Sequence, residues 1–173
     1  MKKIIQTLKN IWSIEELRSK IVTTILLMFV FRVGVHIVLP GLDPTKIDLK
    51  SASGGALGLI DAFAGGAFSQ ASIFALGIMP YISASIFMQL MTILVPQMQK
   101  IQKEGDSGRK KINQWTRYLT VIVTVVQAGA YVAYIEKMNG EAMIHAFTPF
   151  FPYTTTILLT AGTLFVMWLG EKI

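Results

Sequence analysis

Apolar residues fall into long runs separated by polar segments, and this pattern predicts an all-α, polytopic membrane protein. Each run is close to the roughly 20 residues that a helix needs to cross a bilayer core. We expect four transmembrane helices, at residues 21–39, 71–95, 116–135 and 153–170. The polar segments between them predict an outer loop at 40–56, a basic cytoplasmic loop at 96–115 and a second outer loop at 136–152.

The second run has no charged residue, but its interior is unusual for a helix that faces lipid. It contains Gly77 and Pro80, and its Ser83, Ser85 and Gln89 would be costly against acyl chains. One side of this helix is therefore expected to face protein or water. On another side, isoleucines recur at every fourth position and predict one β-branched ridge, formed by Ile78, Ile82 and Ile86.

A short apolar segment rich in glycine precedes this run. Its apolar part, about residues 57–68, is too short to cross a bilayer, and it contains Asp61 and the pair Gly65 and Gly66. Two interpretations stay open on the residues alone. The segment is either a re-entrant half-helix, which needs a protein or cavity lining at membrane depth, or an outer loop that rests on the membrane surface.

The first 20 residues carry five basic side chains, and their apolar residues are spaced as one helical face. This favours an amphipathic helix on the cytoplasmic surface. A signal peptide has a similar outline, but the apolar run that follows is long and is succeeded by turn residues at Pro40 and Gly41 rather than by a small-residue cleavage site.

Composition and charge agree with a membrane protein and predict its orientation. Hydrophobic residues make up 53% of the chain and charged residues 15%, and there is no Cys, which excludes disulfides and thiolate chemistry. With the amino terminus inside, the predicted cytoplasmic segments hold twelve basic residues and the outer loops three. The positive-inside rule therefore places both termini in the cytoplasm, and the net charge of +6 mostly reflects this topology.

Candidate chemistry is sparse, and we expect neither an enzyme nor a metal or cofactor site. Arg32 and His36 lie in the first run, where we favour a structural role with Arg32 held by backbone carbonyls. Residues 105–108 spell Gly-Asp-Ser-Gly, a tetrapeptide of trypsin-like proteases, but no positioned base accompanies it. The basic loop lacks the interleaved aromatic residues of a nucleic-acid site, so no direct nucleic-acid function is expected.

Three stretches resemble the SecY family, the pore-forming subunits of the protein translocation channel. Residues 72–90 (SIFALGIMPYISASIFMQL) are similar to a family signature, residues 103–118 (KEGDSGRKKINQWTRY) to its loop between the second and third spans, and residues 162–171 (GTLFVMWLGE) to the end of its fourth span. The resemblance runs through essentially the whole chain and suggests a bacterial member.

The resemblance implies roles for particular residues. A plug helix that closes the pore from the outer side corresponds to residues 57–70, with Leu57, Ile60, Asp61, Phe63, Gly65, Gly66, Phe68 and Ser69. Ile82 and Ile86 match the ring of apolar side chains at the channel waist. The second and third spans form one side of the lateral gate, for which the candidate residues are Ser83, Ser85, Gln89 and Gln127.

The resemblance also implies a bacterial inner-membrane location and a set of partners. These are SecE and SecG-type subunits, the SecA motor, the ribosome, signal sequences, unfolded preproteins and membrane lipids. Family members have ten spans, and this chain supplies four, so we expect an amino-terminal part that does not conduct alone. Two other hypotheses remain: a membrane anchor or assembly subunit, and half of a small-solute transporter with a helix broken near Gly77 and Pro80.

Overall fold

A computed structural model of the chain describes residues 12–43, 55–138 and 149–173. Within these ranges the regular structure is helical: α2 (Glu15–Val35), α3 (Ala56–Phe63), α4 (Met79–Leu94), α5 (Pro96–Lys103), α6 (Asp106–Met138) and α7 (Phe151–Lys172). The predicted amphipathic helix at 1–20 and the two predicted outer loops lie largely outside the described residues. The described residues confirm the all-α prediction.

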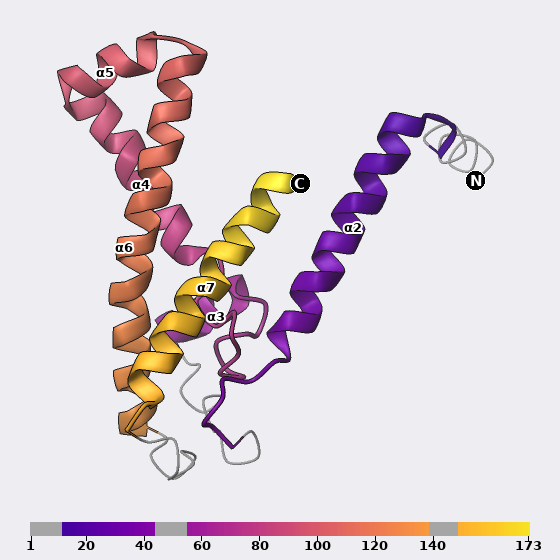
Figure 1. Cartoon of the computed structure of the whole chain (residues 1–173), viewed down its shortest axis with the longest axis vertical. Helices are drawn as coiled ribbons and strands as arrows, with labels where there is room; N and C mark the ends of the chain where they lie inside the picture. Colours follow the sequence, from indigo (N-terminus) through magenta and orange to yellow (C-terminus); the bar gives the residue numbers. More distant parts are fainter. Residues whose placement is uncertain (1–11, 44–54, 139–148) are drawn as a thin grey trace.

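Helices α4, α6 and α7 pack together, whereas α2 leans away from them (Figure 1). Helix α5 folds back between α4 and α6 at one end of the molecule. The first turns of α2 and the last turn of α7 point toward that same end (Figure 1). The carboxyl end of α2 approaches the other helices through the segment that links α3 to α4.

Threonines line the buried face of α6. Thr116, Thr120 and Thr124 follow one another at every fourth residue, and all three are buried. Each hydroxyl donates to the carbonyl four residues earlier, at 2.9, 2.8 and 2.6 Å. Because these small polar side chains are satisfied within their own helix, a neighbouring helix can approach closely without leaving a buried hydroxyl unpaired.

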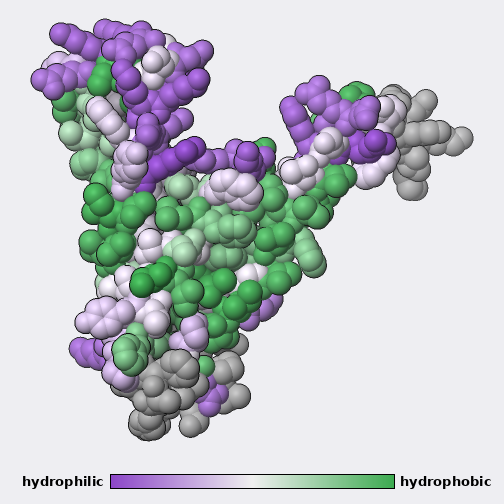
Figure 2. Space-filling view, viewed as in Figure 1, coloured by the Kyte–Doolittle hydropathy of each residue, from purple (hydrophilic) through white to green (hydrophobic). Residues whose placement is uncertain are grey.

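The outer surface has the banding of a membrane protein. Figure 2 shows hydrophobic residues across the middle and hydrophilic residues over α5 and the first turns of α2. Among the described residues, α6 and α7 are long and apolar enough to cross a membrane, and α4 with α5 passes the same test as a pair bent by 100°. Helix α2 is 21 residues long and includes Arg18, Lys20 and Arg32.

The helix bounds differ from the predicted ones in three places. The predicted span at 71–95 is helical only from Met79, because residues 64–78 form consecutive turns. The predicted plug helix at 57–70 is helical only to Phe63. The predicted basic loop at 96–115 is mostly helical, since it contains α5 and the start of α6.

Candidate functional site

The candidate site is built around residues 64–78, an irregular segment enclosed by helices. Ala64, Ala67, Ala71 and Phe74 are buried there and belong to the main apolar core. The backbone is bent by residues with positive φ, at Gly65, Gly66, Ala71 and Gly77. Irregular backbone is tolerated at membrane depth only where protein or a cavity surrounds it, and this segment meets that condition.

Backbone hydrogen bonds join this segment to the residues that follow α2. The amide of Leu39 donates to the carbonyl of Ala71 at 2.9 Å, and the amide of Ile73 donates to the carbonyl of Ile37 at 3.0 Å. These two bonds flank an isolated antiparallel bridge between Val38 and Ser72. The segment is therefore attached to the end of α2 through its own main chain.

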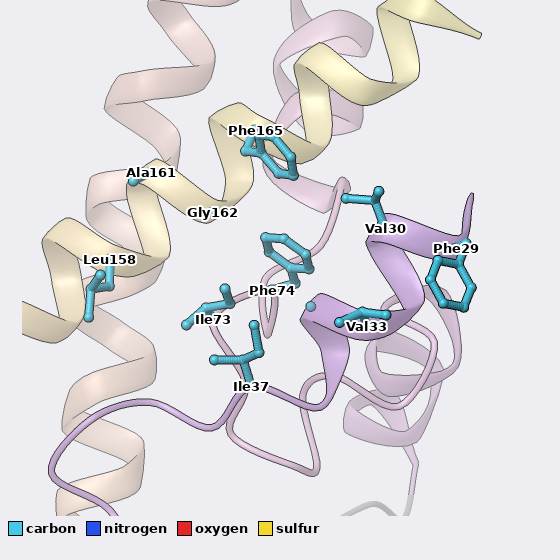
Figure 3. A pocket seen from close by; sticks show the side chains of 11 residues that line it. Phe29, Val30, Val33, Ile37, Ile73, Phe74, Leu158, Ala161, Gly162 and Phe165 are labelled. Carbon is cyan, nitrogen blue, oxygen red and sulfur yellow. The ribbon is translucent and has the colours of Figure 1, made fainter. Parts of the chain in front are cut away.

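Phe74 is the central side chain of the segment. Its ring stacks between Phe31 of α2, with centroids 5.6 Å apart, and Phe165 of α7, with centroids 5.9 Å apart. Glycines allow this approach, because a Cβ on Gly34 would overlap the Phe74 ring and a Cβ on Gly162 would overlap the carbonyl oxygen of Ile73. Figure 3 shows Phe74 pointing toward Phe165 and Gly162.

Beside Phe74 lies an apolar cavity of about 550 Å³ between α2 and α7. Its walls come from Phe29, Val30 and Val33 of α2 and from Leu158 and Ala161 of α7 (Figure 3). Gly34 and Gly162 line the same cavity, so their close contacts lie where α2 and α7 come near each other.

Helix α6 holds the opposite side of the segment. The Tyr131 hydroxyl donates to the carbonyl of Phe68 at 2.9 Å, and both residues are buried. The Phe68 ring also contacts Tyr131 and Tyr134, at centroid distances of 4.9 and 6.1 Å. The Phe68 carbonyl also accepts from the Ala71 amide at 3.2 Å, so the Tyr131 hydroxyl is its second donor and joins the segment to α6.

Polar side chains of α2 contact the same segment. Arg32 Nη1 donates to the carbonyl of Gly65 at 3.2 Å, as predicted for an arginine held by backbone. His36 Nδ1 lies 3.1 Å from Gln70 Oε1. This second pair could not be predicted, because nothing in the local sequence pattern links residues 34 positions apart.

The residues assigned to the plug fall into two groups. On α3, Phe63 is exposed and Ile60 packs partly against the core; the side chain of Leu57 lies outside the described residues. After α3, Phe68 and Ser69 are buried. Asp61 links the groups, because its Oδ1 accepts a hydrogen bond from the Ser69 amide at 2.9 Å and its carbonyl accepts one from the Gly66 amide at 2.9 Å.

The isoleucine ridge is shorter than predicted. Ile82 and Ile86 lie one turn apart on α4 and are 37% and 52% exposed. Ile78 precedes the helix and packs instead against the core, where it lines a separate cavity with Val166 and Leu169 of α7. Of the three predicted ridge residues, only Ile82 and Ile86 are therefore exposed together on α4.

The four gate candidates separate into two pairs between α4 and α6. Ser83 and Gln127 line a cavity of about 340 Å³ that also contacts Ile60 and Tyr131. Ser85 and Gln89 are hydrogen-bonded to each other at 3.3 Å and line a more polar cavity of about 220 Å³ nearer α5. Both pairs lie on the α4–α6 seam, although they do not form a single site.

The end near α5 carries ion pairs and tight turns. Arg117 of α6 makes two hydrogen bonds with the Glu171 carboxylate of α7, at 2.9 and 2.6 Å. In the protease-like tetrapeptide, Gly105 has φ 75° and a Cβ on Gly108 would overlap the carbonyl oxygen of Ile101. These glycines therefore serve the turn from α5 into α6, which explains the tetrapeptide without catalysis.

This geometry defines a helical membrane protein in which an irregular, buried segment enters among longer helices. The SecY family model matches residues 72–173. The chain is similar to protein translocase subunits SecY from Buchnera aphidicola subsp. Schizaphis graminum (42% identical, over 100% of this chain and 40% of that protein), Aquifex aeolicus (40% identical, 96% and 40%) and Pseudomonas aeruginosa (44% identical, 92% and 36%).

The chain belongs to the SecY family. It spans about two fifths of the length of the curated relatives it matches. The resemblance to this family that was noted in the sequence is thereby confirmed.

Proposed function

We propose that this chain is part of the central channel subunit of a Sec translocase, which moves unfolded secretory proteins across the bacterial inner membrane and releases membrane segments sideways into lipid. Family membership across the whole chain is the observation that carries the proposal. The proposed topology has four crossings, made by α2, α4, α6 and α7, with both termini in the cytoplasm. The shared direction of the first turns of α2 and the last turn of α7 supports it (Figure 1).

In this proposal, α3 is the plug helix and the exposed pair Ile82 and Ile86 contributes to the apolar ring at the channel waist. The pair has the properties that such a ring needs. The side chains are apolar and exposed, and they lie one turn apart, so they can exclude water from a narrow gap and part around a polypeptide.

The seam between α4 and α6 is proposed as one side of the lateral gate. Ser83, Ser85, Gln89 and Gln127 all line cavities on this seam. Polar side chains in cavities between membrane helices tolerate the passage of water or a polar segment better than a seam of leucines would. The proposed partners are SecE and SecG-type subunits, SecA, the ribosome, signal sequences and preproteins.

Site-specific crosslinking tests the channel proposal. A photoreactive residue replaces Ile82 or Ile86 in the complete subunit, and a stalled secretory chain is then engaged. We expect adducts with the secretory chain at both positions. Ile122 and Val126 of α6 are a matched control pair, since they are also one turn apart, apolar and 63% and 68% exposed. We expect lipid adducts alone at the control pair.

Lipid adducts alone at Ile82 and Ile86 would overturn the assignment of the ring and favour an anchor or transporter. The plug assignment has its own test, because replacing residues 61–69 by a flexible linker should raise ion leak through the complete channel. An unchanged leak would remove α3 from that role.

Topology is tested with single cysteines, which the 173 residues lack. A membrane-impermeant thiol reagent should label Ser107→Cys only from the cytoplasmic side and Lys137→Cys only from the outer side. Labelling of both from one side would contradict the proposed crossing by α6.

A further inference from the structure

We propose that α5 is a brace that fixes the spacing of α4 and α6 at their proposed cytoplasmic ends, and that Gly108 is the positioning residue that makes this brace rigid. The inference rests on the proposed role of the α4–α6 seam as one side of the lateral gate. It assigns a task to the protease-like tetrapeptide at residues 105–108, which is to hold this wall of the gate in one shape.

Helices α4, α5 and α6 form a closed triangle. Helix α5 contacts both of the others, and α4 and α6 also contact each other. The axis of α5 is bent by 100° from that of α4, after which α6 returns alongside α4 (Figure 1). The ends of α4 and α6 therefore cannot move apart or together unless α5 changes its angle to one of them.

Side-chain packing does not set the spacing of α4 and α6 inside this triangle. A cavity of about 220 Å³ lies there, and all three helices line it, with Thr92 of α4, Gln102 of α5 and Asn113 of α6 among the residues. Close-packed protein leaves few voids larger than a water molecule, so the two helices are not held here by filling the space between them. Helix α5 is the element that spans them at this level.

Hydrogen bonds fix the joint between α4 and α5. Val95 separates the two helices; its amide donates to the Met91 carbonyl at 2.9 Å, and its carbonyl accepts from the Gln99 amide at 3.1 Å. The Gln99 side chain also reaches back to α4, where its Nε2 donates to the carbonyl of Ile93. Carbonyls in the last turn of a helix lack a partner within the helix, so this bond both satisfies Ile93 and ties α5 to α4.

Glycines fix the joint between α5 and α6. Gly105 follows α5 with a φ of +75°, a conformation in which helices commonly end. In the first turn of α6, Gly108 is buried, and a Cβ built there would lie 1.7 Å from the carbonyl oxygen of Ile101 in α5 and 2.8 Å from its carbonyl carbon. Both are main-chain atoms and cannot swing aside as a flexible side chain would. Even an alanine at position 108 would therefore push α5 and α6 apart.

The brace acts on residues already assigned to the gate. Ser85 and Gln89 of α4 line the same cavity, so their position relative to α6 depends on the angle of α5. A rigid brace keeps them in place while the gate opens elsewhere, whereas a loosened brace lets α4 tilt on its own.

Spin labels on α4 and α6 of the complete subunit, cleared of other cysteines and placed in vesicles, measure this spacing. The labels are attached at Leu94→Cys and Ile122→Cys, where the native side chains are 73% and 63% exposed. We expect a narrow distance distribution that does not change when a stalled secretory chain is engaged. Gly108→Ala should broaden and shift the distribution. Gly129→Ala is the matched control and should leave it unchanged, because a Cβ built there has nothing within 4 Å.

Release of a membrane segment into lipid measures the consequence for the gate. We expect Gly108→Ala to lower this release several-fold. A short bifunctional thiol reagent that joins Thr92→Cys to Asn113→Cys across the cavity should restore it, because the link replaces the brace. A loss caused by misfolding alone would not be restored in this way.

A second variant loosens the brace without a clash. Gln99→Ala removes the side chain that binds the Ile93 carbonyl, and it should also broaden the distance distribution. Gln97→Ala is its matched control, since Gln97 is an exposed glutamine of the same helix whose side chain makes no hydrogen bond within the described part of the chain. It should leave the distribution unchanged.

Three results would overturn the inference: a broad distribution in the parent protein, a spacing that changes when the secretory chain is engaged, and a distribution that neither Gly108→Ala nor Gln99→Ala alters. A broadened spacing with undiminished release would overturn the link between the brace and the gate. Failure of the proposed channel function is recognised separately, because it would leave the spacing intact and give lipid adducts alone at Ile82 and Ile86.

Discussion

Replacing Gly162 by Ala tests whether the contact between α7 and the irregular segment 64–78 depends on the absence of a side chain. The new Cβ would overlap the carbonyl oxygen of Ile73 and lie 3.2 Å from the Phe74 ring. The carbonyl belongs to the main chain of a segment that is held on three sides, so it cannot turn away as a flexible side chain would.

Gly129 of α6 provides the matched control. It also lies inside a helix, but a Cβ built there has nothing within 4 Å. Both substitutions gain the helix propensity of Ala over Gly, about 1 kcal/mol. That gain cancels when the two variants are compared, so the difference measures the clash, which is expected to cost about 1–3 kcal/mol, as overpacking of a filled core does.

The measurement is the free energy of unfolding of each variant in the same detergent, followed by helical circular dichroism. We expect Gly129→Ala to equal or exceed the parent in stability and Gly162→Ala to fall below Gly129→Ala by about 1–3 kcal/mol. Equal stabilities for the two variants, within about 0.5 kcal/mol, would refute the close approach of α7 to Ile73 and Phe74.

Three further predictions concern single contacts. Tyr131→Phe keeps the ring but removes one of the two donors to the Phe68 carbonyl, so it should cost about 0.5–1.5 kcal/mol and speed hydrogen exchange in residues 67–72; unchanged exchange would contradict the bond. Ala71→Gly should change stability by less than about 1 kcal/mol, because the strain relieved at φ +47° offsets the loss of a buried methyl group; a cost of about 2 kcal/mol or more would contradict this compensation. Arg117→Gln should cost at most about 1 kcal/mol at low salt, since the ion pair with Glu171 is partly exposed, and the cost should shrink in high salt; a cost that salt does not change would argue against an ionic contact.

The all-α class follows from hydropathy, but the helix ends differ from the predicted bounds where polar or glycine-rich sequence is involved. Within the predicted span at 71–95, Gly77 and Pro80 mark where the helix begins, because Gly77 takes a positive φ and Pro80 belongs to the first turn of α4. Proline is favoured in the first turn of a helix, where its missing N–H costs nothing, so Pro80 marks a helix start rather than a kink. Likewise Pro96 opens α5 inside a stretch that was expected to be a loop.

The packing of the irregular segment 64–78 could not be predicted from local sequence signals, because its contacts join positions that are distant along the chain. Tyr131 and Phe68 are 63 residues apart, and neither residue stands out locally as half of a hydrogen-bonded pair. Arg32 was the exception, because a charged group inside an apolar run needs a partner wherever it lies, and a backbone carbonyl was the expected one.

Glycines in this structure serve two different purposes, and the sequence alone does not tell them apart. Gly34 and Gly162 lie within regular helices, where the residue is costly by about 1 kcal/mol, and each is retained at the point where Phe74 or its neighbour packs. Gly65 and Gly66 have room for a Cβ, which would lie 3.8 and 3.6 Å from its nearest neighbour, but their φ is positive, a conformation that L side chains rarely adopt. Gly65→Ala should cost about 1–2 kcal/mol through its positive φ without displacing a neighbour, whereas Gly34→Ala should displace the Phe74 ring directly. Glycine is therefore required at these positions for two different reasons, which are space beside Phe74 and backbone conformation before Ala67.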